Sequence, residues 1–425
     1  MTTSIHARIN LGLDFIVRNM KNGGVPSASL GDAAGNWSTA ESLEAILTAA
    51  PLIPDRRAIC LEMADYLLRH QGVDGSWSLV EDGISACSMA TAQSIIALHK
   101  TRKIADATLA SRIDTAIANA LSWLKSSQNS SGGWAVEPYH EYPESDVREY
   151  PTYMAIRALG ELGEVAENSQ SVRLAVNYLW SLYDGHGGFS SAEGLKSDPC
   201  STVRAYTSIS TAGCAGETVD LMGRVTKYIF SSRPQSGLWP LRSEKYPRGV
   251  SGSVEYNHNT LAHLLQFFTR VRPDTCDQAQ LADWFVNHQN DDGSWCLGGD
   301  ERSFPNIVTW PTSEAILALI HYERSLSVQQ FETETPQQVV GIHKVSNRTR
   351  FAVSILLAVV LVQFLMLIGA WDGVRESWLR LPTEFRQSFS WTLAIGITIN
   401  SLTGLVGFIL GRALRKRGSN VVRRS

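Results

Sequence analysis

The sequence has little net charge and no concentrated basic region in its N-terminal part. Of its 425 residues, 38 are lysine or arginine and 41 are acidic, which gives a formal net charge of −3. Without an arginine-rich patch the chain has no electrostatic footprint for nucleic acid, so we expect no nucleic-acid partner. It begins without a basic segment followed by a long apolar run, so no signal peptide is expected.

Closely spaced cysteines are also missing. The six cysteines are scattered and form no Cys-x-x-Cys pair, and they are Cys60, Cys87, Cys200, Cys214, Cys276 and Cys296. In a reducing compartment such cysteines are expected to be free thiols, most of them small core residues.

A repeat runs from the N-terminus to about Tyr322. Six Gly-containing turns, most of them followed by an aromatic residue, separate segments that are apolar at helical spacing, and the turns recur at nearly equal intervals. These turns are Gly23-Gly24-Val25, Gly75-Ser76-Trp77, Gly132-Gly133-Trp134, Gly187-Gly188-Phe189, Gly237-Leu238-Trp239 and Gly293-Ser294-Trp295. One period holds two helices, because glycine supplies the positive φ that ends a helix tightly. Single helix pairs cannot bury their apolar faces alone, and either an open solenoid or a closed ring would solve this. Six pairs favour the closed ring, an all-α (α/α)6 toroid over residues 1–322.

The turn phrases HQGVDGSW, SQNSSGGW and HQNDDGSW resemble the repeats of the squalene cyclase and protein prenyltransferase β-subunit superfamily. Prenyltransferase β-subunits place an Asp-x-Cys after a Gly-Gly-Phe turn, and a His opens the inner helix of the next repeat. The matching residues here are Asp198, Cys200 and His258. The resemblance therefore implies a zinc site in which these three residues are both the metal ligands and the catalytic groups. A carboxylate, a thiolate and an imidazole leave the fourth position of a tetrahedral zinc open for a substrate thiol.

The same resemblance implies where an isoprenoid diphosphate would bind. Arg148 and Lys196 are the cations nearest the positions where the family binds diphosphate, although the family's own Arg and Lys are replaced by Ala192 and Leu195. Aromatic residues of the inner helices are expected to line a chamber for the isoprenoid tail. They are Tyr150, Tyr153, Tyr206, Tyr256 and Trp310.

Three functions follow from these observations. The first is an enzyme: zinc-assisted transfer of an isoprenoid from its diphosphate to a thiol, with a protein acceptor or partner subunit. The second is a toroid that binds a lipid or peptide without chemistry. The third, a terpene cyclase-like enzyme, is disfavoured because the family's Asp-x-Asp-Asp is absent and Cys200 is too weak an acid to protonate an alkene.

The C-terminal part changes in composition. Residues 323–350 are polar and are expected to form a linker. Residues 351–410 hold two apolar segments, Phe351 to Ala370 and Trp391 to Leu410, each long enough for a helix to cross a membrane. Basic residues precede the first segment and fill the tail at 411–425, so the toroid and the C-terminus are both expected to be cytoplasmic. The sequence thus predicts a toroid tethered to the cell membrane by a transmembrane hairpin of two spans.

Overall fold

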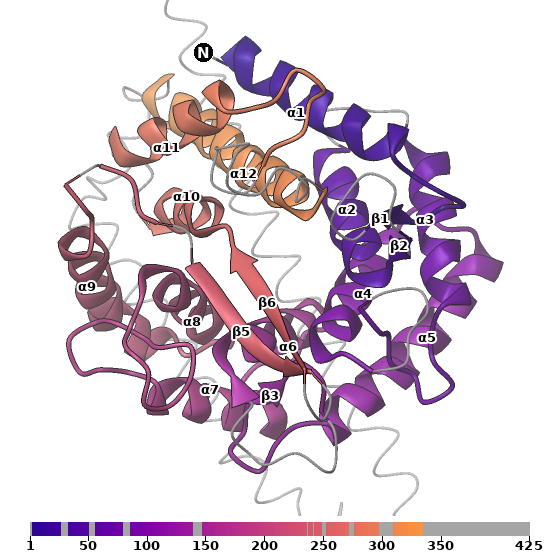
Figure 1. The fold of residues 1–425 in the computed structure, drawn as a ribbon, viewed down its shortest axis with the longest axis horizontal. Coiled ribbons are helices and arrows are strands. Elements are labelled where there is room, and N and C mark those ends of the chain that lie inside the picture. The colour runs from indigo at the N-terminus through magenta and orange to yellow at the C-terminus, as the bar shows by residue number, and fades with distance from the viewer. Residues whose placement is uncertain are drawn as a thin grey trace, which may run out of the picture. The chain divides into compact units, whose positions relative to one another are not determined.

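The computed structural model describes residues 2–26, 33–50, 56–79, 86–138, 147–235, 237–240, 242–248, 252–271, 276–296 and 309–334. These residues form twelve helices that alternate between an outer and an inner ring (Figure 1). The outer helices are α1 (Thr2–Arg18), α3 (Arg57–Arg69), α5 (Ala107–Ser126), α7 (Gln170–Ser181), α9 (Ala215–Ser231) and α11 (Cys276–Asn287). The inner helices are α2 (Asn36–Ala49), α4 (Ser88–Thr101), α6 (Glu149–Glu161), α8 (Pro199–Thr211), α10 (Thr260–Val271) and α12 (Thr309–Glu334).

The inner ring is closed. Each inner helix packs against the next, and α12 packs against α2. The predicted helix pairs and the toroid are confirmed, because a closed ring gives every repeat two neighbours against which to bury its apolar face. Inner helices such as α2 and α4 are buried on nearly all sides, since they lie between the outer ring and the centre.

The turn glycines have the predicted backbone conformation. All six first glycines have positive φ, between 86° and 111°. Five of them also lie against the backbone of the next outer helix around the ring: a Cβ on Gly132 would lie 2.3 Å from the carbonyl oxygen of Leu174 in α7. Glycine is therefore required both for the turn and for the close approach between repeats.

The tryptophans of three turns connect the two helices of their pairs. The Trp134 indole donates to the carbonyl of Leu124 in α5 at 2.8 Å, and its backbone N–H donates to Thr152 Oγ1 in α6 at 3.0 Å. Trp77 and Trp295 make the same two contacts in their own repeats.

The glutamine of each phrase connects neighbouring repeats. Gln128 Nε2 donates to the carbonyls of Gly132 and Ser171, at 2.7 and 2.9 Å. The equivalent Gln289 donates to the carbonyl of Arg8 in α1 at 2.8 Å and so links the last outer helix to the first. The repeat motif is thus a set of hydrogen bonds that build the ring.

Three two-stranded antiparallel sheets, which the sequence analysis did not predict, lie in the loops before inner helices. They are formed by β1 (Val25–Pro26) with β2 (Ala34–Gly35), β3 (Trp134–Ala135) with β4 (Val147–Arg148), and β5 (Arg242–Arg248) with β6 (Gly252–His258). The pair β5–β6 is the longest and crosses the face of the ring (Figure 1). An expectation of purely helical structure is therefore wrong between α9 and α10.

Helix α12 continues to Glu334, so the predicted linker begins inside a helix. The two predicted membrane spans at 351–410 and the basic tail lie outside the described residues. In the part of the chain that is described, no helix combines the length and the apolar character needed to span a bilayer.

Candidate functional site

The three predicted zinc ligands lie at one end of the inner ring, and each has surroundings of its own. Asp198 caps α8, where its carboxylate accepts from the N–H of Ser201 at 3.0 Å, and it forms an ion pair with Arg242. The family motif predicts that His258 is the first residue of an inner helix. Instead it is the last residue of β6, and the inner helix α10 begins at Thr260.

Cys200 is fully buried in the first turn of α8. Burial raises the pKa of its thiol to about 12, although the charge of Arg204 opposes this shift. Among the described residues, no group of three or more His, Cys, Asp or Glu side chains has an arrangement that could hold a metal ion. The observed partners of the three residues do not fit a shared zinc ion, and bound zinc stays a prediction for metal analysis.

The residues predicted to hold the isoprenoid diphosphate are dispersed. Arg148 is half-buried at the end of β4, Lys196 is exposed, and Tyr206 is buried edge-to-face against Phe267. Trp310 is half-buried in the first turn of α12, and the side chain of Tyr256 lies outside the described part. The four described side chains do not line the pocket discussed below, which Tyr153 does line.

A buried arginine, which the sequence analysis did not single out, connects this end of the ring. Arg204 in α8 donates to Glu149 Oε2 in α6 at 2.7 Å and lies 3.0 Å from Nδ1 of His258. Its guanidinium also lies over the ring of Tyr150, 4.3 Å from the centroid. The signal in the sequence was a charged residue on an inner helix, where small and apolar residues predominate.

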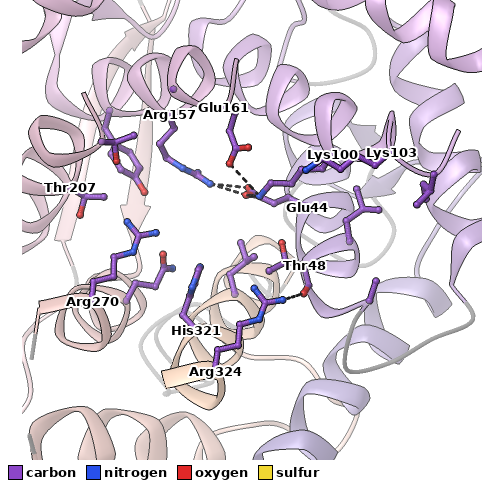
Figure 2. Close-up of a pocket in the computed structure, with 18 residues that line it drawn as sticks. Glu44, Thr48, Lys100, Lys103, Arg157, Glu161, Thr207, Arg270, His321 and Arg324 are labelled. Carbon is purple, nitrogen blue, oxygen red and sulfur yellow. Dashed lines mark hydrogen bonds and ion pairs between the residues drawn. The ribbon is translucent and has the colours of Figure 1, made fainter. Parts of the chain in front are cut away.

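A pocket with a volume of about 670 Å³ lies at the opposite end, where the inner helices terminate (Figure 2). All six inner helices contribute to it, through residues that include Glu44, Thr48, Lys100, Tyr153, Arg157, Glu161, Thr207, Gln266, Arg270, Leu317, His321 and Arg324, with Lys103 and Ile104 from the turn after α4. We call it the basic pocket. It was not predicted, because the family resemblance places the diphosphate near Arg148 and Lys196, which do not line this pocket.

Cations outnumber carboxylates in the basic pocket. Its five lysines and arginines are Lys100, Lys103, Arg157, Arg270 and Arg324, and its two carboxylates are Glu44 and Glu161. Burial, together with Arg270 and Arg324, lowers the pKa of His321 to about 4, so this histidine is neutral at physiological pH. Five positive against two negative charges leave an excess of three positive charges.

Glu44 pairs with two of the five cations, Lys100 and Arg157. Its carboxylate accepts from Lys100 Nζ at 2.6 Å and from Arg157 Nη2 at 2.9 Å (Figure 2). Although burial alone would raise the pKa of Glu44, Arg157 and Lys100 hold it well below its usual range. Within the described residues, Arg270 and Lys103 have no side-chain hydrogen bond or ion pair. These two cations are free to bind an external anion.

A buried acid cluster lies one helical turn deeper than the floor of the pocket. It consists of Glu41, Glu314 and His263, each three residues before a pocket-lining residue of its own helix: Glu44, Leu317 and Gln266. Residues three apart share a helix face, and three residues rise about 4.5 Å. The cluster therefore follows directly below the pocket in the ring interior.

Both carboxyls of this cluster are held in the protonated form. Burial, and then the charges of Glu314 and Glu44, raise the pKa of Glu41 well above its usual range, against a smaller opposing effect of Arg157 and Trp37. Burial raises the pKa of Glu314 to about 8 although Arg204 and Arg157 oppose it. His263 lies beside Glu314, with Nε2 3.6 Å from Oε1, and burial keeps its pKa well below the usual value.

These raised values predict a pH-dependent stability. Between about pH 5 and pH 8 the folded chain keeps a proton on Glu314 that the unfolded chain loses, so the free energy of unfolding falls as pH rises through this window. Glu44 has the opposite shift, and its contribution is lost as pH falls below about 4.5. The lowered pKa of His321 makes the free energy of unfolding rise with pH between about pH 4 and pH 6.5. Between about pH 6.5 and pH 8 the pH dependence therefore reports on the buried carboxyls and not on His321.

We expect Glu314→Gln to flatten this dependence, since glutamine is neutral at every pH. Relative to the variant, the wild type should lose about 1–2 kcal/mol between about pH 6.5 and pH 8. Urea unfolding of both proteins at several pH values measures the difference. Parallel curves for the two proteins would show that Glu314 ionises normally.

Comparisons with known proteins support the toroid fold and do not determine a function. No protein-family model matches the chain, and no curated protein matches it. Among solved structures, the chain is similar to an α-1,6-mannanase of Salegentibacter sp. (9% identity, TM-score 0.52), which was solved with α-1,6-mannotriose. It is also similar to the type II terpene cyclase MstE from Scytonema (14%, 0.51) and to cellobiose 2-epimerase from Bacillus thermoamylovorans (13%, 0.56).

Each of these likenesses covers 76% of this chain and 99–100% of the other. No prenyltransferase is among these three. At such low identity the likeness concerns the fold alone, which carbohydrate enzymes and terpene cyclases share. The chain therefore has the α/α toroid fold.

Proposed function

We propose that the toroid binds the anionic group of a small ligand in the basic pocket. The observation that carries this proposal is the excess of cations there, with Arg270 and Lys103 lacking partners in the described part of the chain. Arginine is suited to phosphate, because its planar guanidinium donates two parallel hydrogen bonds. A phosphate or diphosphate ester is thus the chemical class that the pocket favours.

An isoprenoid diphosphate belongs to this class, and its transfer to a thiol was the activity predicted from the sequence. The basic pocket supplies cations for a diphosphate that the sequence motif lacks. It lies, however, at the other end of the inner helices from Asp198 and Cys200, and below it are ionisable side chains instead of an apolar chamber. The pocket thus supports anion binding, whereas zinc, thiol transfer and the membrane anchor stay predictions.

Titration calorimetry with pyrophosphate tests the proposal. We expect the wild-type chain to bind and Arg270→Ala to bind about tenfold or more weakly, because a hydrogen bond to a charged group is lost. Binding should also weaken as salt is added. The control is Arg112→Ala, which removes an exposed arginine from outer helix α5.

The control should bind pyrophosphate as the wild type does. If pyrophosphate and inorganic phosphate both fail to bind at millimolar concentration, the basic pocket is not an anion site. Equal losses in the two variants would point to a general surface charge effect and would also contradict the proposal.

A further inference from the structure

The buried acid cluster holds polar atoms without partners, and such atoms are costly. Within the described residues, Glu41 Oε2, Glu314 Oε2 and His263 Nε2 are shielded from solvent and have no hydrogen-bond partner. The 3.6 Å between His263 Nε2 and Glu314 Oε1 is too long for a hydrogen bond. Buried polar groups are nearly always satisfied, so three of them in one place indicate an occupant that donates and accepts hydrogen bonds.

The helices place this cluster in line with the basic pocket. Because each of the three residues precedes a pocket-lining residue by one turn, the cluster continues the same faces of α2, α10 and α12 toward the centre of the ring. Tyr153 connects the two levels: it lines the pocket, and its ring lies edge-on to His263 with centroids 5.9 Å apart. None of the three residues lines the pocket itself, so a ligand would reach them only by extending from the pocket into the ring.

Aromatic rings accompany the acid groups. Tyr153 stacks on Tyr150 with centroids 6.1 Å apart, and Trp37 meets Tyr150 edge-on at 6.0 Å. Trp37 is also hydrogen-bonded to the Glu41 carboxyl. Aromatic faces beside hydrogen-bonding carboxyls suit a group that has hydroxyls on its rim and C–H bonds on its faces.

We propose that the ligand is a sugar phosphate, with its phosphate in the basic pocket and its ring hydroxyls against Glu41, Glu314 and His263. The inference rests on the proposed anion binding and adds the class of the organic part. A protonated carboxyl donates one hydrogen bond and accepts others, which matches the dual character of a hydroxyl group. An isoprenoid tail offers no hydrogen bonds and would leave the three buried atoms unsatisfied.

Titration calorimetry on the full chain distinguishes a sugar phosphate from an isoprenoid diphosphate as the ligand. The probes are inorganic phosphate, a panel of hexose phosphates (esters of glucose, mannose and galactose), the free hexoses and geranylgeranyl diphosphate. We expect at least one hexose phosphate to bind about tenfold or more tightly than inorganic phosphate, because its hydroxyls satisfy the buried atoms. The free hexoses should bind much more weakly than their phosphates.

Two substitutions of Glu314 test whether the buried acid cluster causes the preference for hexose phosphate over inorganic phosphate. Glu314→Leu should bring the ratio of hexose phosphate to phosphate affinity down toward one, while Glu314→Gln, which can still donate and accept, should keep part of it. Circular dichroism confirms that each variant is folded, and Arg112→Ala should leave the ratio unchanged. If Glu314→Leu does not fold, Glu41→Leu provides the same comparison for the other carboxyl.

The inference is overturned if phosphate binds but no hexose phosphate binds more tightly, or if geranylgeranyl diphosphate binds more tightly than every sugar ester. An unchanged affinity ratio in Glu314→Leu also overturns it. Failure of phosphate and sugar phosphates alike would instead contradict the proposed anion site itself.

Discussion

Replacement of Arg204 by methionine is expected to lower the free energy of unfolding by about 3–5 kcal/mol. Arg204 and Glu149 are almost inaccessible to solvent, at 1% and 0% exposure, and their side chains form a two-pronged ion pair. Methionine fills much of the same volume, but it leaves the Glu149 carboxylate buried without its counter-charge. The cost is mainly that of an uncompensated buried charge.

Urea unfolding of Arg204→Met beside Arg102→Ala measures this effect. Arg102 pairs with Asp114 on the surface, where both side chains are about half exposed, so its removal should cause no measurable change. The double variant Arg204→Met with Glu149→Leu should recover much of the loss, because no charge is left buried. A loss in Arg204→Met no larger than that in Arg102→Ala would refute the buried pair as a structural element.

Replacement of Trp134 by alanine is expected to lower the free energy of unfolding by a similar amount, about 3–5 kcal/mol. Its side chain is fully buried between α5 and α6, and its indole N–H donates to the Leu124 carbonyl. Alanine leaves a cavity at the junction of the two helices of a repeat. Thermal or urea unfolding of the variant gives the size of the loss.

Trp123→Ala is the control, since Trp123 also lies on α5 but is only partly buried. Its loss should be clearly smaller, as less apolar surface leaves the core. Equal losses for Trp123 and Trp134 would mean that the turn tryptophan has no special part in joining the helices of a pair.

The repeat was predictable because each of its features is local. A glycine at positive φ, a tryptophan two residues later and a glutamine four residues before the glycine each act within one turn or on the adjacent helix. The equivalents of Gln128 and Trp134 therefore indicate the same turn in each repeat. The number of helices could be predicted by counting these turns. The hairpin β5–β6 was missed because β5 is mostly polar, and the apolar alternation in β6 is limited to Val254 and Tyr256. Both strands also lie between two helical segments.

The candidate site could be predicted only in part. Asp198 follows the Gly-Gly-Phe turn as the motif requires, and it caps the inner helix α8 through its N-cap hydrogen bond. Its pairing with Arg242 and the pairing of His258 with Arg204 were not foreseen, since each pair joins residues of different repeats that are distant in sequence. The family motif indicated positions in the repeat but not which side chains would meet.

Local sequence was enough to determine the periodic helix pairs and the turn chemistry, because the same hydrogen bonds and helix packing recur in successive repeats. The number of pairs favoured a closed toroid, but the closure itself is a tertiary contact of α12 with α2. Where charge gathers in the ring depends instead on tertiary contacts. Arg157, Arg270 and Arg324 come from three different inner helices, and Glu41 meets Glu314 only because α12 closes on α2. The protonation of that pair depends on burial and on neighbours from distant repeats, which no local pattern of residues encodes.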